Sequence, residues 1–278
     1  MTVTLYAMGE VVLLLSAAIG IGRVSQQRQI DREIDALLAT APSSVAPSIS
    51  EADLTGLPEP VQRWMRWSGV VGNEGVGVVR LKQQGRFQLE GRGWFPFEAD
   101  QYFITQRPAF LWRVSMQMFP LVKVYGRDRY ADGEGGMQIK VLSLVPVVDK
   151  TGEGLNQGAL LRYLGETIWF PSGALSPHIV WRGINDDAAE ATMTYGGVSA
   201  SATFLFDAAG RPTVVEAQRY NDSRGEILPW KVTSTAFGER GGVRMPVEGI
   251  GTWEFEEGEF DYVELRVTTV DYNVPSRY

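Results

Sequence analysis

The chain has 278 residues, of which 44% are hydrophobic and 21% are charged, and this balance excludes an intrinsically disordered protein. Its net charge of -7 and the lack of a dense Lys/Arg stretch argue against nucleic acid as a partner. The chain has no Cys, which excludes disulfides, thiolate metal sites and thiol catalysis.

An apolar segment begins the chain. Residues 3–22 contain one charge, Glu10, and a helix of that length spans the roughly 30 Å hydrocarbon core of a bilayer. Residues 1–9 contain no Lys or Arg, which favours an uncleaved anchor over a cleaved signal peptide. We therefore expect residues 1–24 to form a single transmembrane helix.

Basic residues follow this segment and none precedes it. Arg23, Arg28 and Arg32 come directly after the apolar run. The positive-inside rule places such a flank, and the domain after it, on the cytoplasmic side.

Residues 25–50 are predicted to form a short amphipathic helix and a linker. Ile30, Ile34, Leu37 and Leu38 recur at helical spacing among polar residues, so this helix should lie on the membrane or on the domain. Residues 41–50 are small, uncharged and proline-containing, as in a semi-extended linker. A single domain is expected over residues 51–278.

The domain begins with a helix and continues as strands. Pro58 and Pro60 suit a first helical turn, and Gly69 suits its end. From Val76 onward, short β-branched and aromatic runs alternate with turn residues, which predicts an antiparallel meander. The clearest hairpin joins residues 198–206 to 212–220.

One helix interrupts the strands near residues 155–170. Leu160, Leu161, Leu164 and Ile168 form one apolar stripe, and Pro171 follows the stretch. A strongly curved sheet leaves an apolar concave face uncovered, and a helix of this kind covers it. A ligand is expected at this place.

Residue patterns for known chemistry are absent from the sequence. The single His178 has no partner His and no HExxH motif, and no GxSxG, GxxxxGK[ST] or GxGxxG occurs. Two acidic loops, residues 128–136 and 221–226, lack the EF-hand spacing and are predicted to be hairpin turns. We expect no catalytic residue, no metal site and no cofactor.

Three stretches carry a resemblance to a family. They are Leu57-Pro58-Glu59-Pro60-Val61-Gln62-Arg63-Trp64, then Leu161-Arg162-Tyr163-Leu164-Gly165-Glu166-Thr167-Ile168-Trp169-Phe170-Pro171, and Pro229-Trp230. Together they resemble an uncharacterised bacterial family of membrane-anchored proteins, which implies a plasma-membrane location and no established activity.

The order of the last elements resembles a second group. A strand, the turn Gly241-Gly242-Val243-Arg244-Met245-Pro246 and a final strand over residues 262–274 are similar to the end of the LolA and LppX-like lipoprotein carriers. This resemblance implies a half-barrel: a mainly β fold whose curved antiparallel sheet is covered by a helix over an apolar cavity. It also favours an extracytoplasmic domain, against the positive-inside rule, so both orientations stay open.

Three hypotheses for the function follow. The first is a membrane-anchored, non-catalytic protein that binds a lipid or another apolar molecule. The second is a closed interaction module that holds a protein partner. The third is an enzyme that uses Glu166, Arg162 and Asp132.

Arg113 and Arg219 are further charged residues in aromatic-rich strands. The predicted ligand-binding residues are Trp112, Met116, Arg162, Glu166, Trp169, Phe170, Trp181 and Trp230. Trp94, Phe97 and Met118 are further large side chains expected around the cavity.

Overall fold

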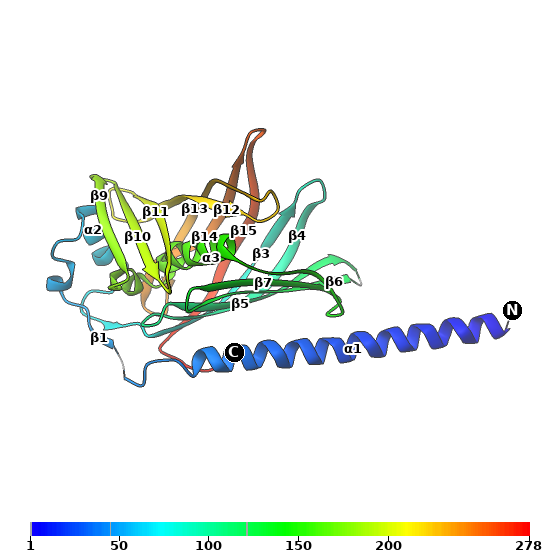
Figure 1. The fold of residues 1–278 in the computed structure, drawn as a ribbon. Coiled ribbons are helices and arrows are strands. Elements are labelled where there is room, and N and C mark those ends of the chain that lie inside the picture. Colours follow the sequence, from blue (N-terminus) through cyan, green and yellow to red (C-terminus); the bar gives the residue numbers. More distant parts are fainter. Residues whose placement is uncertain (1, 45, 121) are drawn as a thin grey trace.

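One long antiparallel sheet dominates the protein (Figure 1). The computed structural model describes residues 2–44, 46–120 and 122–278, with the backbone alone for residues 2–9, 11, 12 and 46. The strands in this part are β1 (Ala46–Ser48), β2 (Glu74–Gly75), β3 (Val78–Leu89), β4 (Gly93–Ile104), β5 (Ala109–Phe119), β6 (Val122–Ala131), β7 (Glu134–Val141), β8 (Val145–Thr151), β9 (Ile179–Asn185), β10 (Ala188–Tyr195), β11 (Val198–Phe206), β12 (Pro212–Asn221), β13 (Glu226–Arg240), β14 (Val243–Phe255) and β15 (Gly258–Tyr272).

The sheet is a meander with one long-range pairing. Its strand order is β8-β7-β6-β5-β4-β3-β15-β14-β13-β12-β11-β10-β9. The long-range pairing joins β3 to β15, the last strand of the chain, in the middle of the sheet. The remaining neighbours are joined in sequence by turns, and all the pairings are antiparallel. This arrangement confirms the predicted mainly β fold with a curved antiparallel sheet.

The predicted hairpin of β11 and β12 is present, with Gly210 at a φ of 84° in its turn. A left-handed residue of this kind is tolerated by Gly because it has no Cβ. The two strands are paired from Thr203 to Phe206 of β11. Before Thr203 they diverge, and the space between them borders on a helix.

The two faces of the sheet bury different sets of side chains. In β4, Phe103 belongs to the main core, whereas its neighbours Tyr102 and Ile104 belong to a second cluster. Because successive side chains of a strand point to opposite faces, these clusters lie on the concave and the convex side. The concave side holds α2 (Glu59–Ser68) and α3 (Glu153–Glu166), and the convex side holds part of α1 (Thr2–Leu38).

The predicted helices α2 and α3 are confirmed. Gly69 ends α2 in the left-handed conformation at a φ of 78°, and Trp64 of this helix is fully buried against Phe204. The short 3-10 turns η2 (Thr167–Trp169) and η3 (Pro171–Leu175) follow α3, and η1 (Glu51–Leu54) precedes α2.

The 37 residues of α1 form one continuous helix, although the sequence predicts an anchor and a separate amphipathic helix. Ile30, Ile34 and Leu38 face the convex side of the sheet and are buried there. Complete burial of such a side chain contributes about 1.5–3 kcal/mol. The amphipathic part of α1 therefore lies on the domain, which is one of the two places predicted for it. The amino-terminal half of α1 projects past the rim of the sheet (Figure 1).

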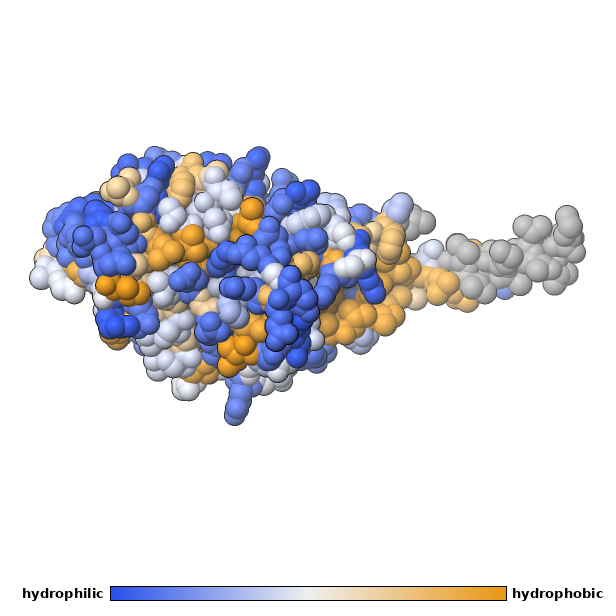
Figure 2. Space-filling view, turned by 90° about the horizontal axis from the view of Figure 1, so that it is seen from above, coloured by the Kyte–Doolittle hydropathy of each residue, from blue (hydrophilic) through white to orange (hydrophobic). Residues whose placement is uncertain are grey.

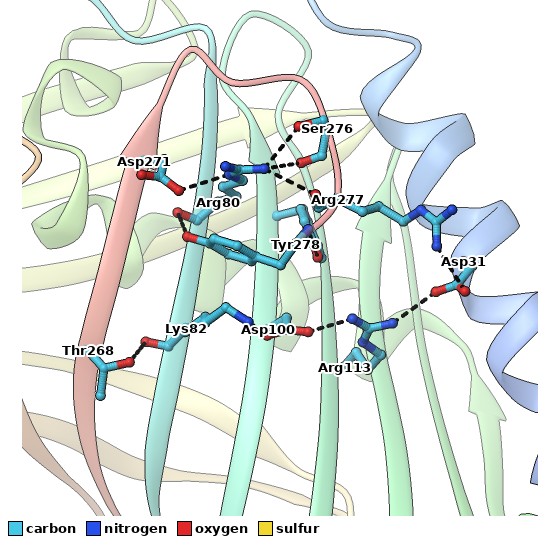
Figure 3. A network of polar contacts seen from close by, with 11 residues as sticks. Asp31, Arg80, Lys82, Asp100, Arg113, Thr268, Asp271, Ser276, Arg277 and Tyr278 are labelled. Carbon is cyan, nitrogen blue, oxygen red and sulfur yellow. Dashed lines mark hydrogen bonds and ion pairs between the residues drawn. The ribbon is translucent and has the colours of Figure 1, made fainter.

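Ion pairs also hold α1 on the sheet (Figure 3). The guanidinium of Arg113 on β5 lies 2.9 Å from Asp31, and that of Arg277 lies 2.9 Å from the other oxygen of the same carboxylate. Tyr278 then stacks beneath Arg80, whose guanidinium carbon is 4.4 Å from the ring centroid. The carboxyl-terminal residues thus connect helix and sheet.

In the described part of the chain, no helix combines the length and apolar character needed to cross a bilayer. The predicted span over residues 3–22 includes residues 3–9, 11 and 12, whose side chains lie outside the description. It stays a prediction.

Two turns of the curved sheet, one from each arm, are in direct contact. Gly133, in the turn between β6 and β7, meets Gly196, between β10 and β11, so closely that a Cβ on Gly133 would lie 2.0 Å from the Gly196 carbonyl oxygen. Tyr130 donates a hydrogen bond of 2.9 Å from its hydroxyl to the Tyr195 carbonyl beside it. This contact makes the sheet a half-barrel around α3.

Candidate functional site

Helix α3 lies inside the half-barrel and contacts both of its arms, β6 to β8 on one side and β10 to β12 on the other. Glycines permit the close approach. A Cβ on Gly154 would lie 2.7 Å from the Tyr220 ring, and a Cβ on Gly135 of β7 would lie 2.5 Å from the Leu155 carbonyl oxygen. The helix therefore fills part of the concavity, and the remainder stays hollow.

The hollow is an apolar cavity of about 340 Å³ between the carboxyl-terminal half of α3 and the sheet. This volume lies within the range of about 300–1,000 Å³ found for ligand pockets. Phe87, Phe97 and Trp112 form an aromatic group on its wall, and the Phe87 and Phe97 ring centroids are 4.6 Å apart. Met116 and Met137 add flexible side chains that adapt to ligands of different shape.

The cavity reaches one rim of the half-barrel. Its lining includes Leu89, the last residue of β3, together with Val124 near the start of β6 and Ile139 near the end of β7. These positions lie beside the β3–β4, β5–β6 and β7–β8 turns, which we name the lower rim. A molecule that enters here would meet apolar side chains first.

A charged cluster closes the inner end of the cavity. Arg162 of α3 donates hydrogen bonds to Glu166 at 2.9 Å and to Asp128 of β6 at 2.6 Å. Gln101 donates a third bond, of 2.7 Å, to the other oxygen of Glu166. The Arg162 guanidinium carbon lies 4.7 Å from the Trp112 ring centroid, so the ring shields one face of the cation.

Burial alters proton binding in this cluster. It raises the pKa of Glu166, although the charge of Arg162 and the hydrogen bonds from Arg162 and Gln101 act in the opposite direction. The reason is that one guanidinium serves two carboxylates, and desolvation disfavours the second negative charge. Burial alone would lower the pKa of Arg162, but the charges of Glu166 and Asp128 outweigh it and raise that pKa.

Two amide side chains border the cluster and have free polar atoms. Trp112 donates a hydrogen bond of 2.8 Å from its indole to Gln83 Oε1, while Gln83 Nε2 is buried and has no hydrogen-bond partner among the residues that the structure describes. The Oε1 atom of Gln101 is likewise buried without a partner in the described part of the chain. Such groups are costly unless a water or a ligand satisfies them.

The structure brings six of the eight predicted ligand-binding residues to the cavity wall: Trp112, Met116, Arg162, Glu166, Trp169 and Trp230. Phe97 also lies there, whereas Trp94 and Met118 are not part of the lining. A ligand role for the six residues stays a prediction.

The other two predicted residues belong to the packed core. Phe170 packs against Phe103, with ring centroids 4.7 Å apart, and Trp181 packs against Phe204 at 5.0 Å. Neither residue is part of the cavity lining, since Phe170 lies between η2 and η3 and Trp181 lies on β9, and both pack into the main core. Aromatic composition alone does not separate core from cavity wall.

Other predicted charged residues lie apart. Asp132 is in the exposed β6–β7 turn, where it pairs with Arg107 at 3.1 Å, so it does not join Arg162 and Glu166. Asp128, four residues earlier, pairs with Arg162 instead.

Arg113 lies on the convex face beside α1. The half-buried His178 rests against the Tyr195 ring at 4.8 Å. The two acidic loops are hairpin turns, as predicted.

A second hollow, of about 730 Å³, lies where β11 and β12 diverge. Ser199, Ser201, Thr203, Gln218 and Lys231 are among its mostly polar lining residues. Although it is larger, it is a groove whose walls mix polar residues with apolar ones such as Ile227 and Trp230. The smaller cavity combines apolar walls with a few convergent polar groups, which is the usual pattern of a small-molecule site.

The fold is similar to a domain from Vibrio parahaemolyticus named for outer membrane lipoprotein sorting, at 12% identity and a TM-score of 0.43, over 79% of this chain and 93% of that one. It is also similar to a LolA superfamily protein from Nitrosomonas europaea, at 12% identity and a TM-score of 0.40, over 71% of this chain and 86% of that one. No curated protein matches the sequence. A family model matches residues 47–265, which confirms the resemblance to an uncharacterised family, and the chain belongs to this family of unknown function, DUF6544.

Proposed function

We propose that the protein binds a lipid-like or other apolar molecule in the cavity between α3 and the sheet, without covalent chemistry, while α1 holds it on a membrane. The observation that carries this proposal is the 340 Å³ cavity, whose walls are apolar and whose charged cluster lies at the inner end. Burial of apolar ligand surface contributes about 25 cal/mol per Å². Binding by area burial therefore needs no reactive group.

Exposed apolar side chains support the membrane part of the proposal. On α1 they are Leu13, Leu14, Leu15, Ile21 and Val24, and at the lower rim they are Phe119, Leu144, Val145 and Val147. Figure 2 shows apolar side chains gathered where α1 leaves the body of the protein. Large exposed patches of this kind mark interaction sites with proteins or membranes.

The helix and the rim form one surface. A Cβ on Gly22 of α1 would lie 2.6 Å from a Leu144 methyl carbon, so helix and β7–β8 turn are in direct contact at this point. Phe119 continues the surface by packing against Phe95, with ring centroids 6.5 Å apart. Since this surface is continuous with the apolar stretch of α1, a lipid surface is its natural partner, and the cavity reaches the same rim.

We also propose a location on the bacterial plasma membrane, with residues 3–22 as the anchor. Arg23, Arg28 and Arg32 favour a cytoplasmic domain, whereas the likeness to lipoprotein carriers favours the other side. Digestion of the domain by an added protease in right-side-out vesicles, but not in inverted ones, would show the extracytoplasmic orientation. The reverse result would show the cytoplasmic one.

Native mass spectrometry of the full-length protein, followed by lipid extraction, tests the binding function. We expect a co-purifying apolar molecule in a one-to-one complex. Met116→Trp, which fills the cavity, should abolish the complex, and Met118→Trp, two residues along β5 but outside the lining, should keep it. A ligand-free mass together with no uptake of added fatty acid or phospholipid would contradict the proposal.

The polar groove supports a second candidate, an interaction module. Within the described ranges, residues 198–202 of β11 have no strand partner on the β12 side, so the facing edges of β11 and β12 border the 730 Å³ groove. An extended segment of a protein partner can add to such an edge through main-chain hydrogen bonds. Protection of amides 198–202 from hydrogen exchange by cellular proteins, with an empty cavity, would favour this function.

A further inference from the structure

Arg219 of β12 is a cation on the cavity wall, and the part of the chain that the structure describes supplies no counter-ion for it. Among the described residues, no carboxylate lies within ion-pair distance of its guanidinium, and its Nε is buried without a hydrogen-bond partner. A buried charge without a partner is costly, and proteins normally pair it. The side chain is half-buried, so water compensates this charge only in part.

The other arginines that border the cavity are neutralised. Arg162 is bound by Asp128 at 2.6 Å and by Glu166 at 2.9 Å. Arg127 is bound by Glu33 of α1 at 2.6 Å. Arg219 therefore supplies the positive charge that the cavity leaves unmatched.

Two indole rings hold this guanidinium in place. Its central carbon lies 4.9 Å from the Trp230 ring centroid and 5.7 Å from that of Trp253. An arginine stacked on aromatic rings is fixed in orientation, while its N–H groups at the edge stay free. The flat fork of N–H donors matches the paired oxygens of a carboxylate or phosphate.

The surroundings leave room for an anion. Arg219 lies on the part of β12 that has no β11 partner. On the helix side its neighbour is Gly158, where a Cβ would be 3.9 Å from the Arg219 Nε, so no helix side chain covers the cation from that position. Trp230 lines both the apolar cavity and the polar groove, so the site adjoins a polar exit.

We propose that Arg219 binds the anionic head group of an amphiphile whose apolar chain occupies the cavity. The ligand class is then a single-chain lipid with a carboxylate or a phosphate head group. This inference rests on the proposed binding function and narrows it from any apolar molecule to a charged one.

Competition against a neutral fluorescent dye, Nile red, tests the inference on the full-length protein in amphipol. Hexadecanoate, hexadecyl phosphate and hexadecanol share one chain and differ in the head group. We expect both anions to displace the dye at concentrations at least about tenfold lower than hexadecanol, because a charge-assisted hydrogen bond to Arg219 is available to the anions alone, and a tenfold difference in affinity corresponds to about 1.4 kcal/mol. The tighter of the two anions identifies the head group.

Substitutions separate the charge from the cavity. Arg219→Met should weaken both anions to the level of hexadecanol and leave hexadecanol itself unchanged. Arg219→Lys should keep part of the preference, because it retains the charge and loses the fork. Arg224→Met is the matched control, since Arg224 pairs with Glu90 at 3.2 Å outside the cavity, and it should behave like the wild type.

The possible failures are distinguishable. Equal displacement by hexadecanol and hexadecanoate in the wild type, or an anion preference that survives Arg219→Met, would overturn the role of Arg219 and leave the apolar binding function intact. If none of the three ligands displaces bound dye, or the dye does not bind, the proposed function fails and the inference fails with it. An unchanged melting temperature of Arg219→Met shows that the variant is folded.

Discussion

Arg162 Nη1 lies 2.6 Å from Asp128 Oδ2, and this contact joins α3 to β6 within the half-barrel. The two residues come from elements that the sequence separates by a whole hairpin. Both residues also line the apolar cavity, so the pair connects helix and sheet at the cavity wall.

Arg162→Met should destabilise the protein by about 3–5 kcal/mol, because it leaves two carboxylates in a buried place without a cation. The exposed fractions are 16% for Arg162 and 20% for Asp128. Arg182→Met is the control, because it removes an ion pair with Glu190 in which Arg182 is 70% exposed. Its loss of stability should stay below about 1 kcal/mol. Urea unfolding measures both variants, and equal losses would argue against the buried cluster.

Glu166→Gln should change how stability depends on pH. Burial raises the folded-state pKa of Glu166 above its ordinary value of 4.5, so the folded protein binds this proton more tightly than the unfolded chain does. The contribution of Glu166 to stability is therefore lost as pH rises from about 4.5 through the raised pKa, by at most about 1.4 kcal/mol per pH unit. The variant should gain stability relative to the wild type over that window, and parallel curves would contradict the raised pKa.

A spin label at position 119 should report insertion of the lower rim into lipid. The chain has no Cys, so Phe119→Cys carries a single label. In proteoliposomes this label should be accessible to oxygen and shielded from a water-soluble nickel complex. Val180→Cys is the control, because Val180 is also exposed, at 69%, but lies on β9 at the far edge of the sheet. If both labels are open to nickel, the lower rim does not enter the bilayer.

Ile34→Ala should loosen α1 from the sheet. Ile34 is fully buried on the convex face, and such a truncation costs about 2–5 kcal/mol. Hydrogen exchange should accelerate over residues 26–38 and remain slow in β4 and β5. Arg28→Ala, on the exposed side of the same helix, should leave the exchange unchanged. Acceleration throughout the sheet would show that α1 and the sheet unfold together.

The sequence predicted the mainly β class and several elements, but it divided α1 into an anchor and a separate amphipathic helix. Strand alternation identified β11 and β12, and the apolar stripe of residues 160, 161, 164 and 168 identified α3. The pair of Arg162 and Glu166 followed from helical spacing alone, because residues four apart share a face. Nothing local showed that β11 and β12 would diverge, since this depends on α3 lying between the arms.

The site was predictable only in part. Asp128 and Asp132 have the same side-chain parity along β6, but Asp132 has a φ of 49° in the turn and leaves the strand pattern. Gln83 on β3 accepts a hydrogen bond from Trp112 of β5, and Gln101 on β4 donates one to Glu166 of α3, and no local pattern in the sequence shows these pairings. The sequence shows Arg219 as a charged residue in an aromatic-rich strand. Only the structure shows that no described carboxylate lies within ion-pair distance of it.

The continuous backbone of α1 has a consequence for transport. The 37 residues form a rod about 55 Å long, and its second half is fastened to the sheet by Ile34 and Asp31. The described helix is continuous between its apolar half and its docked half, so no flexible linker separates the domain from the apolar segment. If α1 is anchored in a membrane, the domain would stay at a fixed position at the membrane surface and could not act as a diffusible carrier. Its ligand would have to arrive and depart at that one surface, and passage across an aqueous gap would need a separate, diffusible partner.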